Sequence, residues 1–366
     1  MRLCFIGTAA SSHVLKWIKY FVEKNHEVSL ISLGFVKKVP IGGLKVFSVK
    51  PHDFMNPNNI IKVVSLFKTI NRMIAKINPD LIHAHQISAL AYIVPFLRVH
   101  PYILSAWGSD VLIKRYKSKI HSFLASNAIK KADLLHCDGI KTLRALENLG
   151  APSNRIICVN FGVDIDTFSP EKKDTKYRQA LGIGNGPTVI STRALSPIYN
   201  VETLISAIPR VVREIKNANF LICGDGPLKG KLEKLSRKLN ISDHTFFTGN
   251  ISVEELPIYV ASSDIYVSTS LSDAGLAIST GEAMACGLPV IITEDPDNRD
   301  WIDDGVNGFI VPVKNPDVLA DRIIELIKNK HLRMEFGELN RNIIIERNNY
   351  NTEMGKMEKE YIKLVS

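Results

Sequence analysis

Two charged side chains, Arg193 and Glu282, lie where α/β sheets bind their ligands. Residues 264 to 313 read as a strand, a polar loop, a helix that begins near Ile278, and a second strand. The first backbone N–H groups of such a helix can bind an anion, and the helix dipole favours negative charge there. Glu282 follows on the first turns of the helix, where a carboxylate can accept hydrogen bonds from ribose hydroxyls. The stretch therefore predicts a nucleotide site.

Arg193 comes directly after an apolar strand predicted over residues 189–192. A guanidinium at this strand end can bind a diphosphate through two hydrogen bonds, although a surface salt bridge is the alternative. The turn Gly224-Asp225-Gly226-Pro227 follows the next strand, but it lacks the spacing of the dinucleotide fingerprint. The pattern disfavours a nicotinamide or flavin enzyme.

The first half of the chain carries polar and aromatic residues at two strand ends. His83 and His85 end the strand in PDLIHAH, and WGSD, residues 107–110, ends the next strand. Each alone is typical of structure, as a buried histidine, a packed indole or a helix cap. Together we expect them to converge on a crevice between two domains. The triplets 164–166 and 295–297 have an Asp-x-Asp spacing that can hold a metal, but such triplets are common by chance.

Strand-like and helical patterns alternate from the first residue onward, which predicts parallel sheets covered on both faces. A chain of 366 residues exceeds what one core usually supports, so we expect two domains. Residues 160–170 break the alternation and read as the linker. The expected strands are 3–6, 28–32, 44–49, 81–84, 102–105, 134–137 and 156–159, then 189–192, 220–223, 246–247, 265–267, 289–292 and 309–313; the expected helices are 12–24, 58–76, 200–215, 228–239, 253–261, one from 278, and those over 315–365.

Charge is divided unevenly along the chain. Residues 1–164 hold 22 Lys and Arg against 9 Asp and Glu, a net of +13, whereas residues 165–366 hold 24 against 28, a net of −4. This asymmetry suggests contact with lipid head groups or nucleic acid, and a solubilising surface is the alternative. The basic amphipathic stretch 58–76 either lies on a membrane surface or packs on the sheet.

Two further features of the composition concern location and redox state. The apolar run over residues 87–97 is too short to span a bilayer, and residues 1–7 lack a signal-peptide core, so we expect a cytoplasmic protein. The five cysteines have no Cys-x-x-Cys spacing, and we expect buried free thiols.

Motifs along nearly the whole chain resemble those of the retaining glycosyltransferases of family 4, which have the GT-B fold. The resemblance implies two Rossmann-like, doubly wound parallel-sheet domains that face each other across a crevice. It implies an acceptor-binding domain over 1–164, a nucleotide-sugar-binding domain over 165–345, and a C-terminal helix over 346–366 that crosses back to the first domain. The matching motifs are PDLIHAH, WGSD, KADLLHCD, NFGVDIDTF, RALSPIYNVETLI, CGDGPLKGKLEKL, FTGNISVEELPIYVASSDIYVSTS and GEAMACGLPVI with GVNGFIV.

Matched by position, Glu282 corresponds to the second glutamate of the family's paired motif, which binds the donor ribose. Arg193 corresponds to the arginine on the donor diphosphate. The first glutamate of the pair is replaced by Ala274, with Asp273 one residue away. We expect Asp273 to reach the hydroxyls of the donor sugar.

Two further positions depart from the family. Tyr199 and Asn200 stand in place of the usual lysine, and Trp107 stands in place of a histidine. The resemblance implies three sets of site residues. The catalytic set is Asp110, Arg193 and Glu282; the donor-binding set is Arg193, Tyr199, Asn200, Gly224, Gly226, Asn250, Asp273, Gly275, Leu276, Thr280 and Glu282; the acceptor-binding set is Thr8, His13, His85, Trp107 and Asp110.

The implied activity is transfer of a hexose from a nucleotide diphosphate sugar, with retention and without a metal or other cofactor. The acceptor is a saccharide or a lipid-linked saccharide, as in polysaccharide or glycolipid biosynthesis. A lipid-linked acceptor would bring the protein to an anionic membrane at its inner face, and no nucleic acid partner is expected. A catalytically silent sugar-nucleotide-binding protein is one alternative, because three motif residues are missing, and a sugar-nucleotide epimerase is another.

Overall fold

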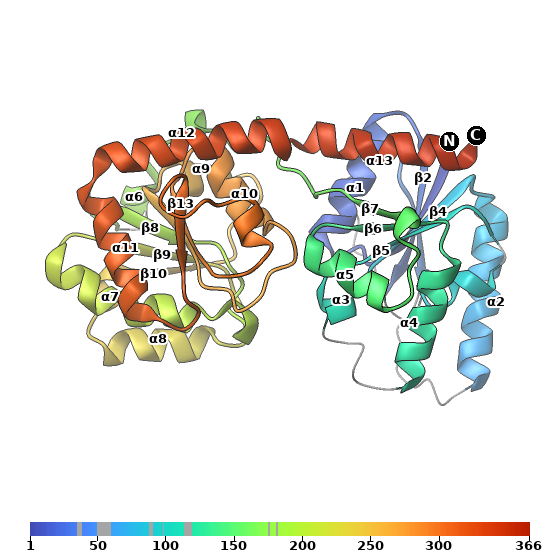
Figure 1. Cartoon of the computed structure of the whole chain (residues 1–366), viewed down its shortest axis with the longest axis horizontal. Helices are drawn as coiled ribbons and strands as arrows, with labels where there is room; N and C mark the ends of the chain where they lie inside the picture. The colour runs from blue at the N-terminus through green and yellow to red at the C-terminus, as the bar shows by residue number, and fades with distance from the viewer. Residues whose placement is uncertain are drawn as a thin grey trace. The chain divides into compact units, whose positions relative to one another are not determined.

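The chain folds into two compact units, each built on its own parallel β-sheet (Figure 1). Unit 1 comprises residues 1–161 and 351–366, and unit 2 comprises residues 162–350. The expected α/β class is therefore confirmed. The computed structural model describes residues 1–34, 39–49, 60–87, 91–97, 99–112, 119–174, 176–180 and 182–366.

The sheet of unit 1 has the strand order β3-β2-β1-β4-β5-β6-β7. The order reverses between β1 and β4, and α/β sheets bind ligands beyond the carboxyl ends of strands at such a switch point. Each strand expected from the sequence is present. The bounds are β1 (Arg2–Gly7), β2 (Glu27–Leu33), β3 (Lys45–Val49), β4 (Leu81–His85), β5 (Tyr102–Ser105), β6 (Leu134–Cys137) and β7 (Ile156–Cys158).

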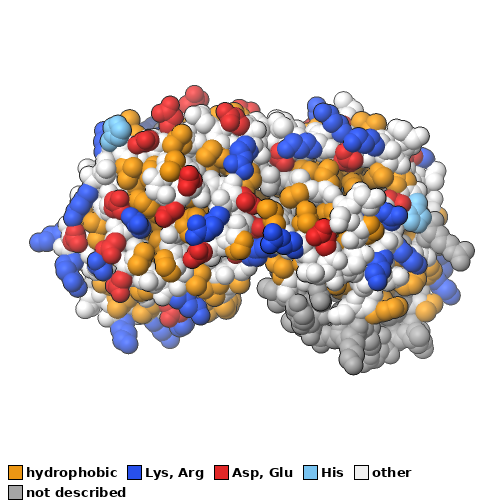
Figure 2. All heavy atoms as spheres, in the orientation of Figure 1, with side chains coloured by type: hydrophobic (Ala, Val, Ile, Leu, Met, Phe, Trp, Pro, Cys, Tyr) orange, Lys and Arg blue, Asp and Glu red, His pale blue; other side chains and the backbone are white. Residues whose placement is uncertain are grey.

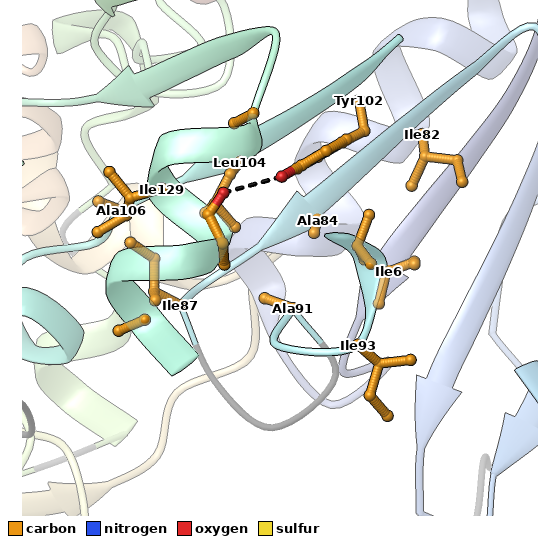
Figure 3. Packing of buried hydrophobic residues seen from close by; sticks show 14 of the residues in the cluster. Ile6, Ile82, Ala84, Ile87, Ala91, Ile93, Tyr102, Leu104, Ala106 and Ile129 are labelled. Carbon is orange, nitrogen blue, oxygen red and sulfur yellow. Dashed lines mark hydrogen bonds between the residues drawn. The ribbon is translucent and has the colours of Figure 1, made fainter. Parts of the chain in front are cut away.

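The helices of unit 1 pack on this sheet and bury its apolar side chains. Figure 3 shows Ile6, Ile82 and Tyr102 in the resulting cluster, where the Tyr102 hydroxyl donates to the Ala128 carbonyl at 2.8 Å. The described helices are α1 (Ser12–Glu23), α2 (Ile60–Ile77), α3 (Ser109–Leu112), α4 (Lys119–Lys131), α5 (Ile140–Asn148) and α13 (Tyr350–Val365).

Helix α2 resolves part of the question raised by its basic amphipathic pattern. Residues 58 and 59 of the predicted helix lie outside the described residues. Within the helix, Leu66, Ile70 and Ile74 are buried against the core of unit 1, which is ordinary packing of an amphipathic helix. The side chains at positions 68, 72 and 76, which are Lys, Arg and Lys, are exposed. A membrane contact of α2 would therefore be electrostatic, because its apolar face is already buried.

The sheet of unit 2 has the order β10-β9-β8-β11-β12-β13, which reverses between β8 and β11. Neighbouring residues point to opposite faces, as strands require: Val189 lies in one hydrophobic cluster and Ile190 in the other. The strands are β8 (Thr188–Ser191), β9 (Asn219–Cys223), β10 (Thr245–Gly249), β11 (Ile265–Ser268), β12 (Val290–Thr293) and β13 (Gly308–Val311); the helices are α6 (Lys176–Ala180), α7 (Val201–Glu214), α8 (Lys229–Lys238), α9 (Leu256–Ala261), α10 (Ile278–Ala285), α11 (Pro316–Lys328) and α12 (Lys330–Arg347).

The surface of unit 2 mixes charges of both signs. On the face shown in Figure 2, Lys and Arg side chains lie among Asp and Glu side chains. Exposed ion pairs join Lys231 to Glu202 at 2.7 Å and Arg299 to Glu294 at 2.7 Å. This interspersion agrees with the small net charge of residues 165–366.

The cysteines give one correction. None of the five, all of which the structure describes, forms a disulfide; Cys4, Cys137, Cys223 and Cys286 are buried as expected, but Cys158 is exposed. The expectation was wrong for Cys158 because β7 is an edge strand of the sheet, and an apolar strand pattern does not distinguish an edge from a centre. Among the described helices, none has the length and apolar character needed to cross a bilayer.

Candidate functional site

Arg193 lies two residues beyond β8, at the switch point of the unit 2 sheet, and is only 8% exposed. Its Nη2 donates to Asp273 Oδ1 at 2.5 Å, and its Nη1 donates to Ser279 Oγ at 3.1 Å. Its guanidinium carbon lies 4.2 Å from the centre of the Tyr199 ring. Burial opposes the charge, but Asp273 outweighs this effect and the pKa of Arg193 is raised. The buried Nε has no partner among the described residues, and three of the five N–H groups of the guanidinium are not used by Asp273 or Ser279.

Ser279 connects Arg193 to the first turn of α10. Besides the bond from Arg193, Ser279 Oγ accepts a hydrogen bond from the Tyr266 hydroxyl at 2.9 Å. Tyr266 is fully buried on β11, so it fixes Ser279 and hence the guanidinium. The N-terminus of a helix carries positive partial charge. The guanidinium and the helix end therefore both favour an anion at this place.

Asp273 lies in the loop between β11 and α10, with its side chain 9% exposed. Its Oδ1 accepts from Arg193 and also from Ser270 Oγ at 3.2 Å. The sequence led us to expect this carboxylate on the hydroxyls of a donor sugar, and that contact stays a prediction. In the structure, the carboxylate instead neutralises the buried guanidinium.

Two aspartates from the triplet 295–297 brace the same loop. Asp297 Oδ2 accepts from the Gly275 N–H at 2.8 Å, and Asp295 Oδ2 accepts from the Asp273 N–H at 3.4 Å. Both side chains are buried and spend acceptor atoms on the backbone. Within the described ranges, no group of three or more His, Cys, Asp or Glu side chains could hold a metal ion.

The turn after β9 packs directly on the backbone that carries Arg193. A Cβ on Gly224 would lie 2.7 Å from the Arg193 carbonyl oxygen, and one on Gly226 would lie 2.5 Å from that of Leu195. Both glycines have positive φ, 151° and 157°. Only glycine meets both demands, so these residues shape the site through the backbone.

The other predicted donor residues lie on several elements of unit 2. Glu282 is half-buried on α10, and Arg341 of α12 donates to the last carbonyl of that helix, Ala285, at 2.7 Å. Asn200 begins α7 in a left-handed conformation, with φ of 46°. The remaining residues of the set are Leu276 and Thr280, which are buried, and Asn250, which is exposed after β10.

In unit 1, a chain of buried hydrogen bonds crosses the neighbouring strands β4, β5 and β6. Tyr361 of α13 bonds His83 Nδ1, and His83 Nε2 lies 2.6 Å from Ser105 Oγ. Ser105 Oγ lies 2.8 Å from His136 Nδ1, and His136 Nε2 lies 2.7 Å from the Val159 carbonyl oxygen. All four side chains are at most 1% exposed.

The Val159 carbonyl fixes the direction of this chain, because a carbonyl oxygen can only accept. His136 Nε2 must therefore donate, and in the neutral imidazole, which burial favours, Nδ1 accepts from the Ser105 hydroxyl. The Ser105 oxygen then accepts from His83 Nε2, and His83 Nδ1 accepts from the Tyr361 hydroxyl. Both imidazoles are neutral in this arrangement. Burial lowers the pKa of His136 to about 4 and that of His83 well below its usual value, which agrees with the neutral state.

His85 stacks on His83 with ring centres 4.1 Å apart, yet neither of its nitrogens has a partner among the described residues. Trp107 lies 5.7 Å from His85 and 5.6 Å from His13, measured between ring centres. The indole Nε1 of Trp107 is also buried without a described partner. Burial, together with the neighbouring His136 and His13, lowers the pKa of His85 to about 3, so this imidazole is neutral. The structure thus brings together three predicted acceptor residues, His13, His85 and Trp107.

Asp110 and Thr8 complete the predicted acceptor set. The Asp110 carboxylate is buried and accepts from the N–H groups of Ile87 at 2.7 Å and Trp107 at 3.0 Å. It therefore holds the two loops that follow β4 and β5, and its proposed catalytic role stays a prediction. Thr8 is exposed directly after β1, where its carbonyl accepts from the Ser11 N–H at 3.0 Å.

Comparison with known proteins gives matches in both units. The family described as "Glycosyl transferase 4-like" matches residues 2–139, and the family described as "Glycosyl transferases group 1" matches residues 173–343. An uncharacterized glycosyltransferase of Methanocaldococcus jannaschii is 30% identical over 280 residues, which cover 75% of this chain and 73% of that protein. The chain belongs to the group 1 glycosyltransferases.

Two further relatives add detail to this family membership. The GDP-mannose-dependent alpha-(1-6)-phosphatidylinositol monomannoside mannosyltransferase of Mycobacterium tuberculosis is 29% identical over 187 residues. That match spans about half of each protein, 49% of this chain and 49% of the mannosyltransferase. The solved structure of Anabaena HepE with UDP and glucose has a TM-score of 0.84 at 20% identity and covers 99% of both chains. This likeness shows the GT-B fold of two Rossmann-like domains.

The structure of this group 1 glycosyltransferase adds residues to the candidate site that the sequence did not single out. Ser279 and Tyr266 fix Arg193, and their only signal was a place in the first turn of a predicted helix and on the preceding strand. Ser105, His136 and Tyr361 complete the buried chain of unit 1. Nothing in the spacing of these three residues indicated that they would meet.

Proposed function

We propose that this group 1 glycosyltransferase transfers a hexose from a nucleotide diphosphate sugar to a saccharide or lipid-linked acceptor, with retention of the anomeric configuration and without a metal. Unit 2 binds the donor, and unit 1 binds the acceptor. The observation that carries the proposal is the Arg193 guanidinium, which is fixed by Ser279 in the first turn of α10 and whose Nε has no partner in the described part of the chain.

The chemistry of leaving-group departure supports this role for Arg193. As the bond from the anomeric carbon to the diphosphate breaks, negative charge develops on the leaving oxygen. A preorganised guanidinium and a helix N-terminus stabilise such charge without reorganisation. The acceptor hydroxyl then attacks the anomeric carbon on the face that the diphosphate leaves, and its proton passes to the departing phosphate oxygen. Retention follows from this same-face path.

Known relatives support the choice of donor. The mycobacterial relative is by its name GDP-mannose-dependent, and the HepE structure contains UDP and glucose. Glu282, half-buried on α10, is proposed to accept hydrogen bonds from the ribose. We propose that the donor of this chain contains a nucleoside diphosphate, the group that these two ligands have in common. The experiment below identifies the base and the hexose.

The experiment screens nucleotide sugars for thermal stabilisation, because a ligand that binds the native state raises the melting point by mass action. Transfer of labelled sugar from the stabilising donors to glycolipid and oligosaccharide acceptors is then measured. We expect transfer by the unmodified protein and loss of transfer in Glu282→Ala. Glu254→Ala, which removes an exposed carboxylate of the same unit, serves as the control and should transfer normally.

Two results would replace the proposal with its alternatives. Stabilisation by a donor with no transfer or hydrolysis would indicate a silent sugar-nucleotide-binding protein. Conversion of the donor sugar to an epimer with no acceptor present would indicate an epimerase. No stabilisation by any nucleotide sugar would overturn the donor assignment itself.

A further inference from the structure

The charge of the Arg193 site is unusual for a place that binds a diphosphate. The guanidinium and the Asp273 carboxylate are both buried, at 8% and 9% exposure, and lie 2.5 Å apart. Their formal charges cancel. The Tyr199 ring covers one face of the guanidinium, at the position where the resembled family has a second cation. The site therefore offers an anion one guanidinium that is already paired.

The carboxylate and an incoming phosphate would share this one guanidinium. Asp273 and Ser279 each accept one of the five N–H groups of this guanidinium, and its Nε has no partner among the described residues. A phosphate bound there lies close to Asp273, and like charges this near in a desolvated site repel each other. The first turn of α10 and Arg193 attract the phosphate, while Asp273 opposes it.

We propose that Asp273 sets the charge of the donor site and keeps nucleoside diphosphate binding weak. This inference rests on the proposed function. Asp273 acts as a specificity-determining residue: it selects against excess negative charge on the ligand and speeds departure of the nucleoside diphosphate product. Asp273 acts through Arg193, which it holds in position together with Ser279.

The Asp273→Asn variant tests this role because it removes the charge and keeps the shape. The asparagine Oδ1 can still accept from Arg193 Nη2, so the guanidinium keeps its place. Affinities are measured by calorimetric titration with the nucleoside, the monophosphate and the diphosphate of the base that the donor screen selects. For a phosphate charge about 6 Å from the Asp273 carboxylate and an effective dielectric of about 20, removing the carboxylate charge corresponds to roughly 100-fold in diphosphate affinity. Screening by salt reduces this gain to about tenfold.

We expect the nucleoside to bind both proteins equally and the diphosphate to bind Asp273→Asn about tenfold more tightly, with the monophosphate between them. The matched control is Asp264→Asn in the same unit. Asp264 precedes β11 at the opposite end of the sheet and accepts from the Thr188 N–H at 2.8 Å. Its loss should leave all three affinities unchanged.

A double variant guards against a folding defect in Asp273→Asn, since a buried guanidinium without its partner can destabilise the unit. Arg193→Gln and the double variant Arg193→Gln/Asp273→Asn are compared in the same titrations. If Asp273 repels phosphate, the double variant binds the diphosphate more tightly than Arg193→Gln does. Equal or weaker diphosphate binding in both comparisons would overturn the inference. Failure of the unmodified protein to bind any nucleoside diphosphate would instead overturn the proposed function.

Discussion

Replacing His85 by phenylalanine tests the neutral state of the buried imidazoles in unit 1. The pKa of His85 is lowered to about 3 by burial and by the neighbouring His136 and His13, whereas an unfolded imidazole titrates near 6.5. The folded pKa lies below the unfolded one, so the unfolded state binds more protons below about pH 6.5. The contribution of the neutral imidazole to the free energy of unfolding is therefore fully present above that pH. It is lost as the pH falls towards the pKa of the folded state.

The magnitude follows from the pH interval. A pH of 5 lies about 1.5 units below the pKa of an unfolded imidazole, so the unfolded state gains a proton there. This lowers the free energy of unfolding by about 2 kcal/mol for each imidazole that stays neutral in the folded state. His85→Phe removes one such group, so its loss of stability between pH 7.5 and pH 5 should be about 2 kcal/mol smaller than that of the unmodified protein. At pH 7.5 the change should cost little or stabilise, because both His85 nitrogens are buried without a described partner.

The assay uses the distribution of the three tryptophans, of which Trp17 and Trp107 lie in unit 1 and Trp301 lies in unit 2. In a Trp301→Phe background, urea unfolding followed by fluorescence reports on unit 1. Ser105→Ala is the control, because it cuts the buried hydrogen-bond chain without removing a titrating group. It should lower stability at every pH and leave the slope between pH 7.5 and 5 as it was. If the stability of His85→Phe falls with pH as steeply as that of the unmodified protein, His85 does not stay neutral because of its burial.

Three further predictions concern other parts of the molecule. Gly226→Ala should destabilise unit 2 by about 1–3 kcal/mol and weaken nucleotide binding, because a Cβ would lie 2.5 Å from the Leu195 carbonyl oxygen; thermal unfolding and titration measure both effects. Tyr361→Phe should lower the stability of unit 1 by about 1–3 kcal/mol in urea unfolding, since it removes the donor to His83 Nδ1. Replacing the three exposed basic side chains of α2 at positions 68, 72 and 76 by glutamine should remove salt-sensitive sedimentation with anionic vesicles, where each basic residue contributes about 1 kcal/mol. Absence of such binding in the unmodified protein at low salt would reject a membrane role for α2.

The fold was predictable because local patterns and global structure agree in this chain. The apolar runs of the expected strands alternate with helical patterns, and parallel α/β sheets require that alternation. Arg193 was also predictable as a site residue, since it lies just beyond the carboxyl end of β8, at the switch point. Position along a strand is a local property that the sequence displays.

What could not be predicted depends on contacts between distant residues. Asp273 lies 80 residues from Arg193, so its bond to the guanidinium could not be inferred from the spacing within its loop. His83 and Tyr361 are 278 residues apart, so their bond has no trace in any local pattern. The exposure of Cys158 depends on which strand ends the sheet, and that order is set by topology.

Titration with a nucleoside diphosphate, with and without the Arg193 side chain, is the direct test of whether this guanidinium binds the donor diphosphate. Arg193→Ala removes the guanidinium beside α10, whereas Arg210→Ala removes an exposed arginine of the same unit that pairs with Asp321. We expect Arg193→Ala to weaken diphosphate binding by at least about tenfold, with nucleoside binding unchanged, and Arg210→Ala to bind as the unmodified protein does. Equal diphosphate affinity in Arg193→Ala and the unmodified protein would contradict it.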